Sequence, residues 1–324
     1  RWWYKHEGDS GIVPVNEPDY FRLGRETHED LARIGRGERY EQVVGEIIEL
    51  ARSEADREKL EQLYRRAGWA AAFGMYIEPM TREEFDPVSI EDEIILDRGE
   101  LWIACTPDRV LRRKIDNRLV YREYKSVGQV SRGWVEHWPY AVQVHIGLKA
   151  IEEELGEKLA YCEVMGLVKG QVAYGRLNHP YVWAFRDGDK WLPQGQGRKG
   201  LDNVPVWEYT GGILEWVRFC GPEIARAMFP MSAPIMLNER LLAELVAQRT
   251  ARERQVAAVV GPAQTDRLLR AEHFESRYAS CKPVIGSPCA YLAACHSAEV
   301  NADPIASGLY SKRIPHRVLE IEEE

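Results

Sequence analysis

Two carboxylates and a lysine have the types and spacing of a metal-dependent hydrolytic site. Asp108 follows Pro107 directly, and Glu123 and Lys125 lie further along, separated by one residue. Side chains alternate between the two faces of a strand, so Glu123 and Lys125 project from one face. If the segment after Asp108 pairs with this strand, two carboxylates meet and would raise one another's pKa unless a cation lies between them. Mg²⁺ or Mn²⁺ meets that need, and Lys125 would orient or deprotonate a metal-bound water to hydrolyse a phosphodiester.

A plainer interpretation treats the same residues as surface groups. Glu123 and Lys125 would then form an exposed ion pair on an edge strand, and Asp108 would be an ordinary turn residue. Three features favour a site: β-forming residues run from Leu119 to Lys125, a proline–aspartate pair precedes them, and a helix with a glutamine follows. We therefore expect a catalytic arrangement here.

Short strands must position these side chains. Asp-Arg-Gly and Asp-Asn turn signals divide the region into strand-like segments over residues 94–97, 101–106, 109–113 and 119–126. The simplest arrangement of four consecutive strands is a β-meander. It would place Asp108 at the start of the strand that neighbours Glu123.

Helical periodicity surrounds this region. A helix that begins near Pro139 and ends at Gly156 carries Gln143 at the border of its apolar stripe, where it could reach substrate or Lys125. The other expected elements are a short helix over 23–34, helices from about 38 to 72, strands over 159–168 and 181–185, and a mainly helical chain beyond Gly211 with an amphipathic stretch at about 238–259.

The composition is that of a globular chain. Its 324 residues are 45% hydrophobic and 29% charged and contain no long uncharged apolar run, which excludes disordered, collagen-like and membrane-spanning classes. There are 43 Lys and Arg against 51 Asp and Glu, a net charge of −8, so any nucleic-acid role must depend on local basic patches. Six cysteines and no signal-like start predict a reducing, cytoplasmic compartment.

Together these residues resemble the PD-(D/E)XK nuclease superfamily, in particular its RecB-like branch, which includes CRISPR-adaptation and phage exonucleases. Asp108, Glu123 and Lys125 match the motif that names the superfamily, and Gln143 matches a glutamine on the following helix. The branch also carries a glycine-x-x-x-histidine pattern on an N-terminal helix, matched by Gly24 and His28. The resemblance implies that His28 is an additional metal ligand with Asp108 and Glu123.

One position departs from the family pattern. Many members have a tyrosine four residues after the glutamine, where this chain has Gly147.

The resemblance also implies a fold and a domain organisation. The expected fold is α/β, a restriction-endonuclease-like core with a central mixed sheet flanked by helices. Residues 1–185 would form the nuclease core, with a helical insertion at about 38–75. Residues 186–324 would form a mainly helical, cysteine-bearing C-terminal lobe packed on that core.

Three cysteines near the C-terminus form a candidate metal cluster. Cys281, Cys289 and Cys295 lie among Pro and Gly residues, where thiolates suit a soft metal or an iron–sulfur centre, which normally needs four ligands. By resemblance to iron–sulfur members of the branch, we expect a [4Fe–4S] cluster whose fourth ligand lies upstream of Arg1. Zn²⁺ and unligated thiols are the alternatives, and such a centre would have a structural role, joining the two chain ends.

Basic and aromatic residues near the predicted site are candidates for DNA contact. Arginines could hold phosphates on either side of the scissile bond, and aromatic rings could stack on the bases of a single strand. These candidates are Arg109, Arg112, Arg113, Arg122, Trp134, Trp138 and Tyr140. The alternatives are a solvated basic hairpin and ordinary core aromatics.

The sequence therefore predicts a Mg²⁺- or Mn²⁺-dependent deoxyribonuclease, in the form of an exonuclease on single-stranded DNA or duplex ends. A recombination, helicase or CRISPR-adaptation protein would be its partner, and no membrane would be involved. The alternative is a non-catalytic DNA-end-binding or adaptor subunit, in which the same site only holds DNA.

Overall fold

The computed structural model describes residues 12–14, 19–97, 102–128, 130–170, 179–193, 201–244, 247 and 310–312. The chain divides into two units, Leu23–Val246 and a unit that combines Arg1–Arg22 with Ala247–Glu324. In the latter, strands β1 (Ile12–Pro14) and β11 (Tyr310–Lys312) pair antiparallel. Cys281, Cys289 and Cys295 lie outside the described residues. The site described below belongs to the unit Leu23–Val246.

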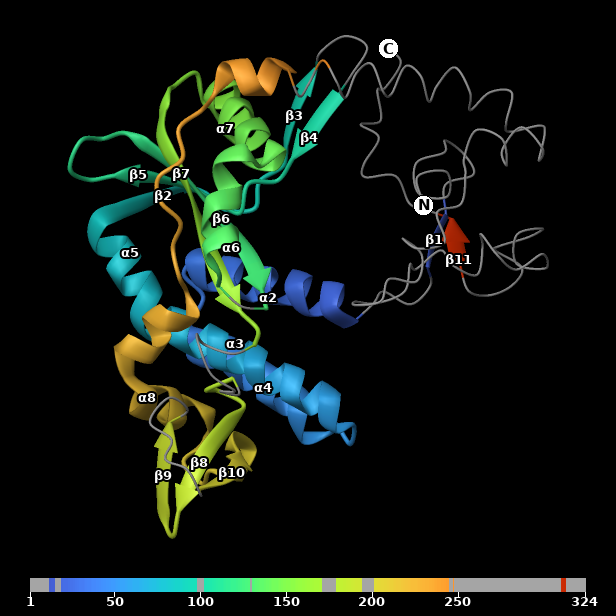
Figure 1. The fold of residues 1–324 in the computed structure, drawn as a ribbon, viewed down its shortest axis with the longest axis vertical. Coiled ribbons are helices and arrows are strands. Elements are labelled where there is room, and N and C mark those ends of the chain that lie inside the picture. The colour runs from blue at the N-terminus through green and yellow to red at the C-terminus, as the bar shows by residue number, and fades with distance from the viewer. Residues whose placement is uncertain are drawn as a thin grey trace. The chain divides into compact units, whose positions relative to one another are not determined.

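A four-stranded mixed sheet is the centre of this unit, in the order β2-β5-β6-β7 (Figure 1). Its strands are β2 (Phe85–Ser89), β5 (Arg109–Arg113), β6 (Leu119–Val127) and β7 (Leu159–Val168). β2 and β6 run antiparallel to β5, whereas β7 runs parallel to β6. A parallel pair needs a long crossover, which α7 (Val142–Leu155) supplies.

Helices cover both faces of the sheet. On one face, Val144, Leu148 and Ile151 of α7 pack with Leu119 and Tyr121 of β6. The opposite face carries Tyr124, which packs against α2 (Asp19–Gly35) and the continuous helical segment formed by α4 (Arg57–Ala72) and η1 (Phe73–Ile77). This arrangement is an α/β fold with a mixed sheet flanked by helices, as predicted.

The helices expected over residues 38–72 are present as α3 (Tyr40–Arg52) and α4. Val43, Val44, Ile47 and Ala51 form the buried face of α3 at helical spacing. Asp56 caps α4 by accepting hydrogen bonds from the N–H groups of the first turn.

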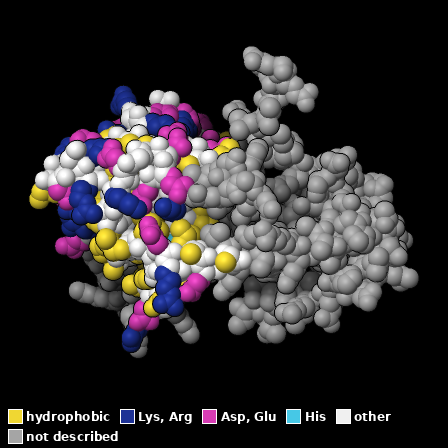
Figure 2. All heavy atoms as spheres, turned by 90° about the horizontal axis from the view of Figure 1, so that it is seen from above, with side chains coloured by type: hydrophobic (Ala, Val, Ile, Leu, Met, Phe, Trp, Pro, Cys, Tyr) yellow, Lys and Arg dark blue, Asp and Glu magenta, His cyan; other side chains and the backbone are white. Residues whose placement is uncertain are grey.

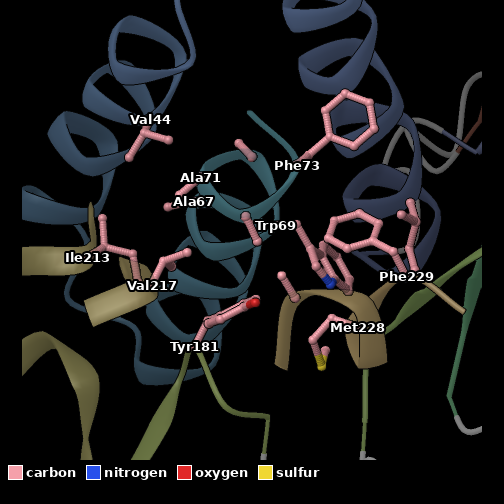
Figure 3. Packing of buried hydrophobic residues seen from close by; sticks show 14 of the residues in the cluster. Val44, Ala67, Trp69, Ala71, Phe73, Tyr181, Ile213, Val217, Met228 and Phe229 are labelled. Carbon is pink, nitrogen blue, oxygen red and sulfur yellow. The ribbon is translucent and has the colours of Figure 1, made fainter. Parts of the chain in front are cut away.

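A cluster of buried aromatic and aliphatic side chains joins these helices to the rest of the unit. Figure 3 shows Trp69 and Phe73 of the α4–η1 segment beside Phe229. Small residues, Ala67, Gly68 and the alanines at 70–72, let neighbouring segments pack closely against α4. At Gly68, for example, an added Cβ would lie 2.2 Å from Cβ of Tyr181.

A second, smaller sheet follows β7. Its order is β10-β8-β9, formed by β8 (Trp183–Asp187), β9 (Lys190–Pro193) and β10 (Asp202–Pro205). The helix α8 (Gly212–Met228) comes next, interrupted at Gly221. The helical expectation beyond Gly211 is confirmed for α8, and residues 239–244 are also helical, but β9 and β10 were not predicted.

Several short elements complete the unit: α5 (Glu78–Glu84), β3 (Ile94–Asp97), β4 (Trp102–Cys105), α6 (Arg132–His137), η2 (Trp138–Tyr140) and η3 (Val206–Glu208). β3 and β4 pair only with each other within the described residues, so the β-meander expectation was wrong. The neighbour of β5 is instead β2, which contains Pro87, a residue that sheets tolerate on an edge strand. The helix expected from Pro139 begins at Val142 and ends at Gly156, whose φ is 66°.

Three free cysteines lie within the described residues. Cys162 and Cys220 are buried as small apolar side chains, while Cys105 is half-buried. Among the described helices, none combines the length and apolar character needed to cross a bilayer.

Candidate metal centre

The backbone register of β5 and β6 places Asp108 beside the middle of β6. Arg109 pairs with Arg122, so Asp108, one residue earlier, lies opposite Glu123. The buried Asp108 carboxylate accepts a hydrogen bond from the Tyr124 N–H through Oδ2. Its Oδ1 lies 3.0 Å from Nδ1 of His28. The carboxylate is therefore held between β6 and α2.

Glu123 is buried, and its carboxylate contacts three polar side chains. The Tyr121 hydroxyl donates to Oε2, the Gln143 amide donates to Oε1 over 2.7 Å, and the Lys125 ammonium forms an ion pair with Oε1. Burial first, and then the charge of Asp108, raise the pKa of Glu123 to about 7, against the lowering effects of Lys125 and Tyr121. The repulsion between Asp108 and Glu123 that the sequence predicted is thus part of this site.

Alternation along β6 explains how these partners meet. Tyr121, Glu123 and Lys125 share the face that α7 covers. The Lys125 side chain is 27% exposed, so its ammonium reaches the solvent edge of the site while Glu123 stays inside. Gln143 lies in the first turn of α7, directly over Glu123. The predicted set of Asp108, Glu123, Lys125 and Gln143 is therefore brought together.

Tyr121 is a member of this site that the sequence did not reveal. A Cβ at Gly147 would lie 2.7 Å from Cε1 of the Tyr121 ring, so the glycine on α7 leaves the space that this ring fills. The Tyr121 hydroxyl then reaches Glu123 from the strand. Gly147 is the one signal in the sequence that a neighbouring side chain occupies this space.

His28 approaches the site from the opposite face of the sheet. Its helix α2 passes close to β6 at Gly24, where a Cβ would lie 3.7 Å from Oγ of Ser126. The His28 ring contacts the Tyr124 ring edge to face, with 6.1 Å between centroids. Burial lowers the pKa of His28, but the hydrogen bond and charge of Asp108 outweigh it, so that the pKa is raised.

Glu91 is the second residue that the sequence did not reveal. It lies in the connection between β2 and β3, and its carboxylate, His28 and Asp108 offer ligand atoms that all lie within 4.8 Å of one another. Burial raises the pKa of Glu91, and the charge of Asp108 adds to this effect. No spacing pattern distinguishes Glu91 from its acidic neighbours Asp92 and Glu93 in the sequence.

This donor set suits a hard divalent ion. One imidazole nitrogen and carboxylate oxygens at this separation are ligands that Mn²⁺ takes, and the carboxylates suit Mg²⁺ as well. Two neighbouring ligands of an octahedral ion with bonds of about 2.1 Å lie about 3.0 Å apart. The 3.0 Å hydrogen bond between His28 Nδ1 and Asp108 Oδ1 is compatible with that edge once Nδ1 has lost its proton.

Comparison of the chain with protein-family profiles and with curated protein sequences gave no match.

Two of the arginines predicted to contact DNA lie inside the protein. The buried Arg109 guanidinium pairs with Glu78, with Nη2 at 2.9 Å from Oε1. Arg122 is also buried, and it donates to Glu163 (2.7 Å) and to Thr81 (2.8 Å). Both guanidinium groups are buried and paired with internal carboxylates, so this placement does not suit phosphate contact.

The other two arginines are at the surface. Arg112 pairs with Glu157, and Arg113 pairs with Asp116. Their side chains are partly exposed, and ion pairs of this kind contribute little to stability. Both can therefore exchange an acidic partner for a phosphate at small cost.

The three predicted aromatic residues have different surroundings. Trp138 is buried and Trp134 packs edge to face against it, with 5.7 Å between centroids. Tyr140, in contrast, is 72% exposed. Of the three, Tyr140 has the open ring that base stacking needs.

Proposed function

We propose that the protein is a Mg²⁺- or Mn²⁺-dependent DNA nuclease with a RecB-like PD-(D/E)XK core. The observation that carries the proposal is the convergence of Asp108, Glu123 and Lys125, which come from two neighbouring strands, on one partly exposed site. A structural ion pair would not need the second buried carboxylate, whose proximity raises the pKa of Glu123.

Each residue has a role that follows from its contacts. Asp108 and His28 would hold the divalent ion together with Glu123, and this ion would supply charge stabilisation at the phosphate and a more acidic water. Lys125, at the exposed edge, would orient that water and, once its ammonium has lost a proton to solvent, would take up the proton of the water. Gln143 would hold the Glu123 carboxylate in place through its 2.7 Å hydrogen bond.

Two arginines and one aromatic ring support a nucleic-acid substrate. Figure 2 shows Lys and Arg side chains interspersed with Asp and Glu side chains on one face of the molecule. Arg112 and Arg113 lie four and five residues along from Asp108, or roughly 13–17 Å at strand spacing. We propose that they contact phosphates away from the scissile bond, and that Tyr140 stacks on an exposed base.

The [4Fe–4S] cluster on Cys281, Cys289 and Cys295 remains a proposal. A brown protein with iron–sulfur charge-transfer absorption would support it, and a colourless, zinc-containing protein would favour the alternative.

End-labelled DNA tests the nuclease proposal. Linear single-stranded, linear duplex and covalently closed circular DNA would be incubated with Mn²⁺, with Mg²⁺ or with EDTA. We expect metal-dependent release of short products from the linear substrates, with circular duplex resistant if the protein is an exonuclease. DNA binding without cleavage under every condition would contradict the nuclease and favour a DNA-end-binding adaptor.

A further inference from the structure

Glu91 has a position that its neighbours in the sequence lack. Its carboxylate faces His28 and Asp108, whereas Asp92 and Glu93 are exposed. Asp92 is instead bonded to its own turn, where its Oδ2 accepts a 2.7 Å hydrogen bond from the Ser89 hydroxyl. Three consecutive acidic residues therefore direct only one carboxylate to the candidate metal centre.

The backbone holds Glu91 against the segment that carries Asp108. The Glu91 N–H lies 3.2 Å from the carbonyl oxygen of Pro107 and 3.3 Å from that of Asp108. Arg36 fixes the preceding residue by donating a 2.6 Å hydrogen bond to the Ile90 carbonyl. Because α2 and β5 flank this loop, the carboxylate is placed by the fold and not by a flexible tip.

The backbone and the charge of Glu91 are both unusual. Its φ is 57°, a left-handed conformation that residues other than glycine adopt uncommonly. Its carboxylate also lies beside that of Asp108, and the two repel each other. A cation between the carboxylates would remove the repulsion.

We propose that Glu91 is a direct ligand of the divalent ion, which is held by His28, Glu91 and Asp108. This inference rests on the proposed metal-dependent function and adds a ligand to it. The three ligands come from a helix, a loop and a strand start that are far apart in the sequence. Glu123, which lies opposite Asp108 on β6, would then complete the site.

Mn²⁺ binding by the DNA-free protein tests this assignment without any measurement of activity. Free Mn²⁺ would be followed by electron paramagnetic resonance in titrations of wild type, Glu91→Gln, Asp92→Asn and Asp108→Asn. Both Glu91→Gln and Asp92→Asn remove one negative charge from the same loop, so they differ in the proposed ligand alone. Substitution of a residue that only hydrogen-bonds to a metal ligand costs about 10–100-fold in metal affinity. We therefore expect Glu91→Gln, which removes a proposed ligand itself, to weaken Mn²⁺ binding by at least about tenfold.

Asp92→Asn should stay within about twofold of wild type, because a solvated charge acts weakly. Glu91→Gly is a second variant, since glycine adopts positive φ without strain; it should fold at least as stably as wild type and also lose Mn²⁺ affinity. Unchanged affinity in Glu91→Gln or Glu91→Gly, with binding lost in Asp108→Asn, would overturn the assignment of Glu91 alone. Absence of Mn²⁺ binding in wild type would overturn the metal-dependent function as well.

Discussion

The Gln143 side-chain amide donates a 2.7 Å hydrogen bond to Oε1 of Glu123 and so joins helix α7 to strand β6 inside the candidate site. The same oxygen pairs with Lys125. One carboxylate oxygen is therefore shared by a residue proposed to move a proton and a residue that only orients. Substitutions of Gln143 and of Lys125 should therefore have different effects on cleavage.

Replacing Gln143 should lower the cleavage rate through Glu123. A hydrogen bond to a charged group contributes about 1.5–3 kcal/mol, so Gln143→Leu should reduce kcat roughly 10–100-fold with little change in the KM for DNA. Gln143→Glu places a like charge beside Glu123 and should reduce kcat more strongly. Steady-state rates on labelled linear DNA measure both variants, and a change in KM alone would show that Gln143 binds DNA instead.

Lys125→Met should separate metal binding from chemistry. Loss of a general base or a water-orienting cation costs about 10²–10⁴-fold in rate, whereas removal of a positive neighbour should leave Mn²⁺ affinity equal or higher. Lys149→Met is the matched control, since Lys149 pairs with Glu153 on the outer side of α7. Single-turnover cleavage and Mn²⁺ titration would be run on both. Equal cleavage by Lys125→Met and wild type would refute the role of Lys125.

Gly147→Ala should disturb the packing beneath the site. The new Cβ would lie 2.7 Å from Cε1 of Tyr121, and overpacking of this kind costs about 1–3 kcal/mol in unfolding free energy. Gly45→Ala is the control: Gly45 is exposed in helix α3 with nothing within 4 Å of the added Cβ, so it should gain about 0.5–1 kcal/mol. Urea denaturation measures both, and similar effects of the two changes would show that Tyr121 does not occupy this space.

His179 should make stability fall at acidic pH. It is buried against Trp69 and Tyr181, and burial, with a smaller contribution from the charge of Arg65, holds its pKa well below 6.5. Below pH 6.5 the unfolded chain takes up a proton that the folded chain does not, so stability present above pH 6.5 is lost as the pH falls. Between pH 7.5 and 5.5 this one group should remove about 1.4 kcal/mol.

The comparison with His179→Gln isolates this contribution. Urea denaturation at pH 7.5 and 5.5 should show a smaller loss of unfolding free energy in the variant, by about 1.4 kcal/mol. An identical pH dependence in both proteins would mean that the His179 ring is protonated equally in the folded and unfolded states.

Local sequence patterns were sufficient for the strands that carry the motif residues. β-forming residues fixed β6 and β7, and a strand that starts at Arg109 directly after Asp108 set the register that brings Asp108 opposite Glu123. Helical spacing placed Gln143 at the edge of α7, from which it reaches Glu123. These features depend on neighbours within one element or on adjacent elements.

Residues whose surroundings come from distant segments could not be inferred. The sequence suggested that Arg109 is a surface cation. Its side chain is instead buried and forms an ion pair with Glu78, which lies on α5 well before it in the chain. Glu91 is one of three consecutive acidic residues, and only the packing of its loop against α2 and β5 selects it. β2 was missed because Pro87 argues against a strand in general but not against an edge strand.

Asp108 provides the most direct test of the account, since it lies between His28, Glu91 and Glu123 in the proposed centre. Cleavage of end-labelled linear DNA in Mn²⁺ would be measured for wild type and Asp108→Asn, with folding checked by circular dichroism. We predict metal-dependent cleavage by wild type, none in EDTA, and a folded variant that cleaves at least about 10³-fold more slowly. Cleavage by a folded Asp108→Asn protein at the wild-type, Mn²⁺-dependent rate would contradict the account.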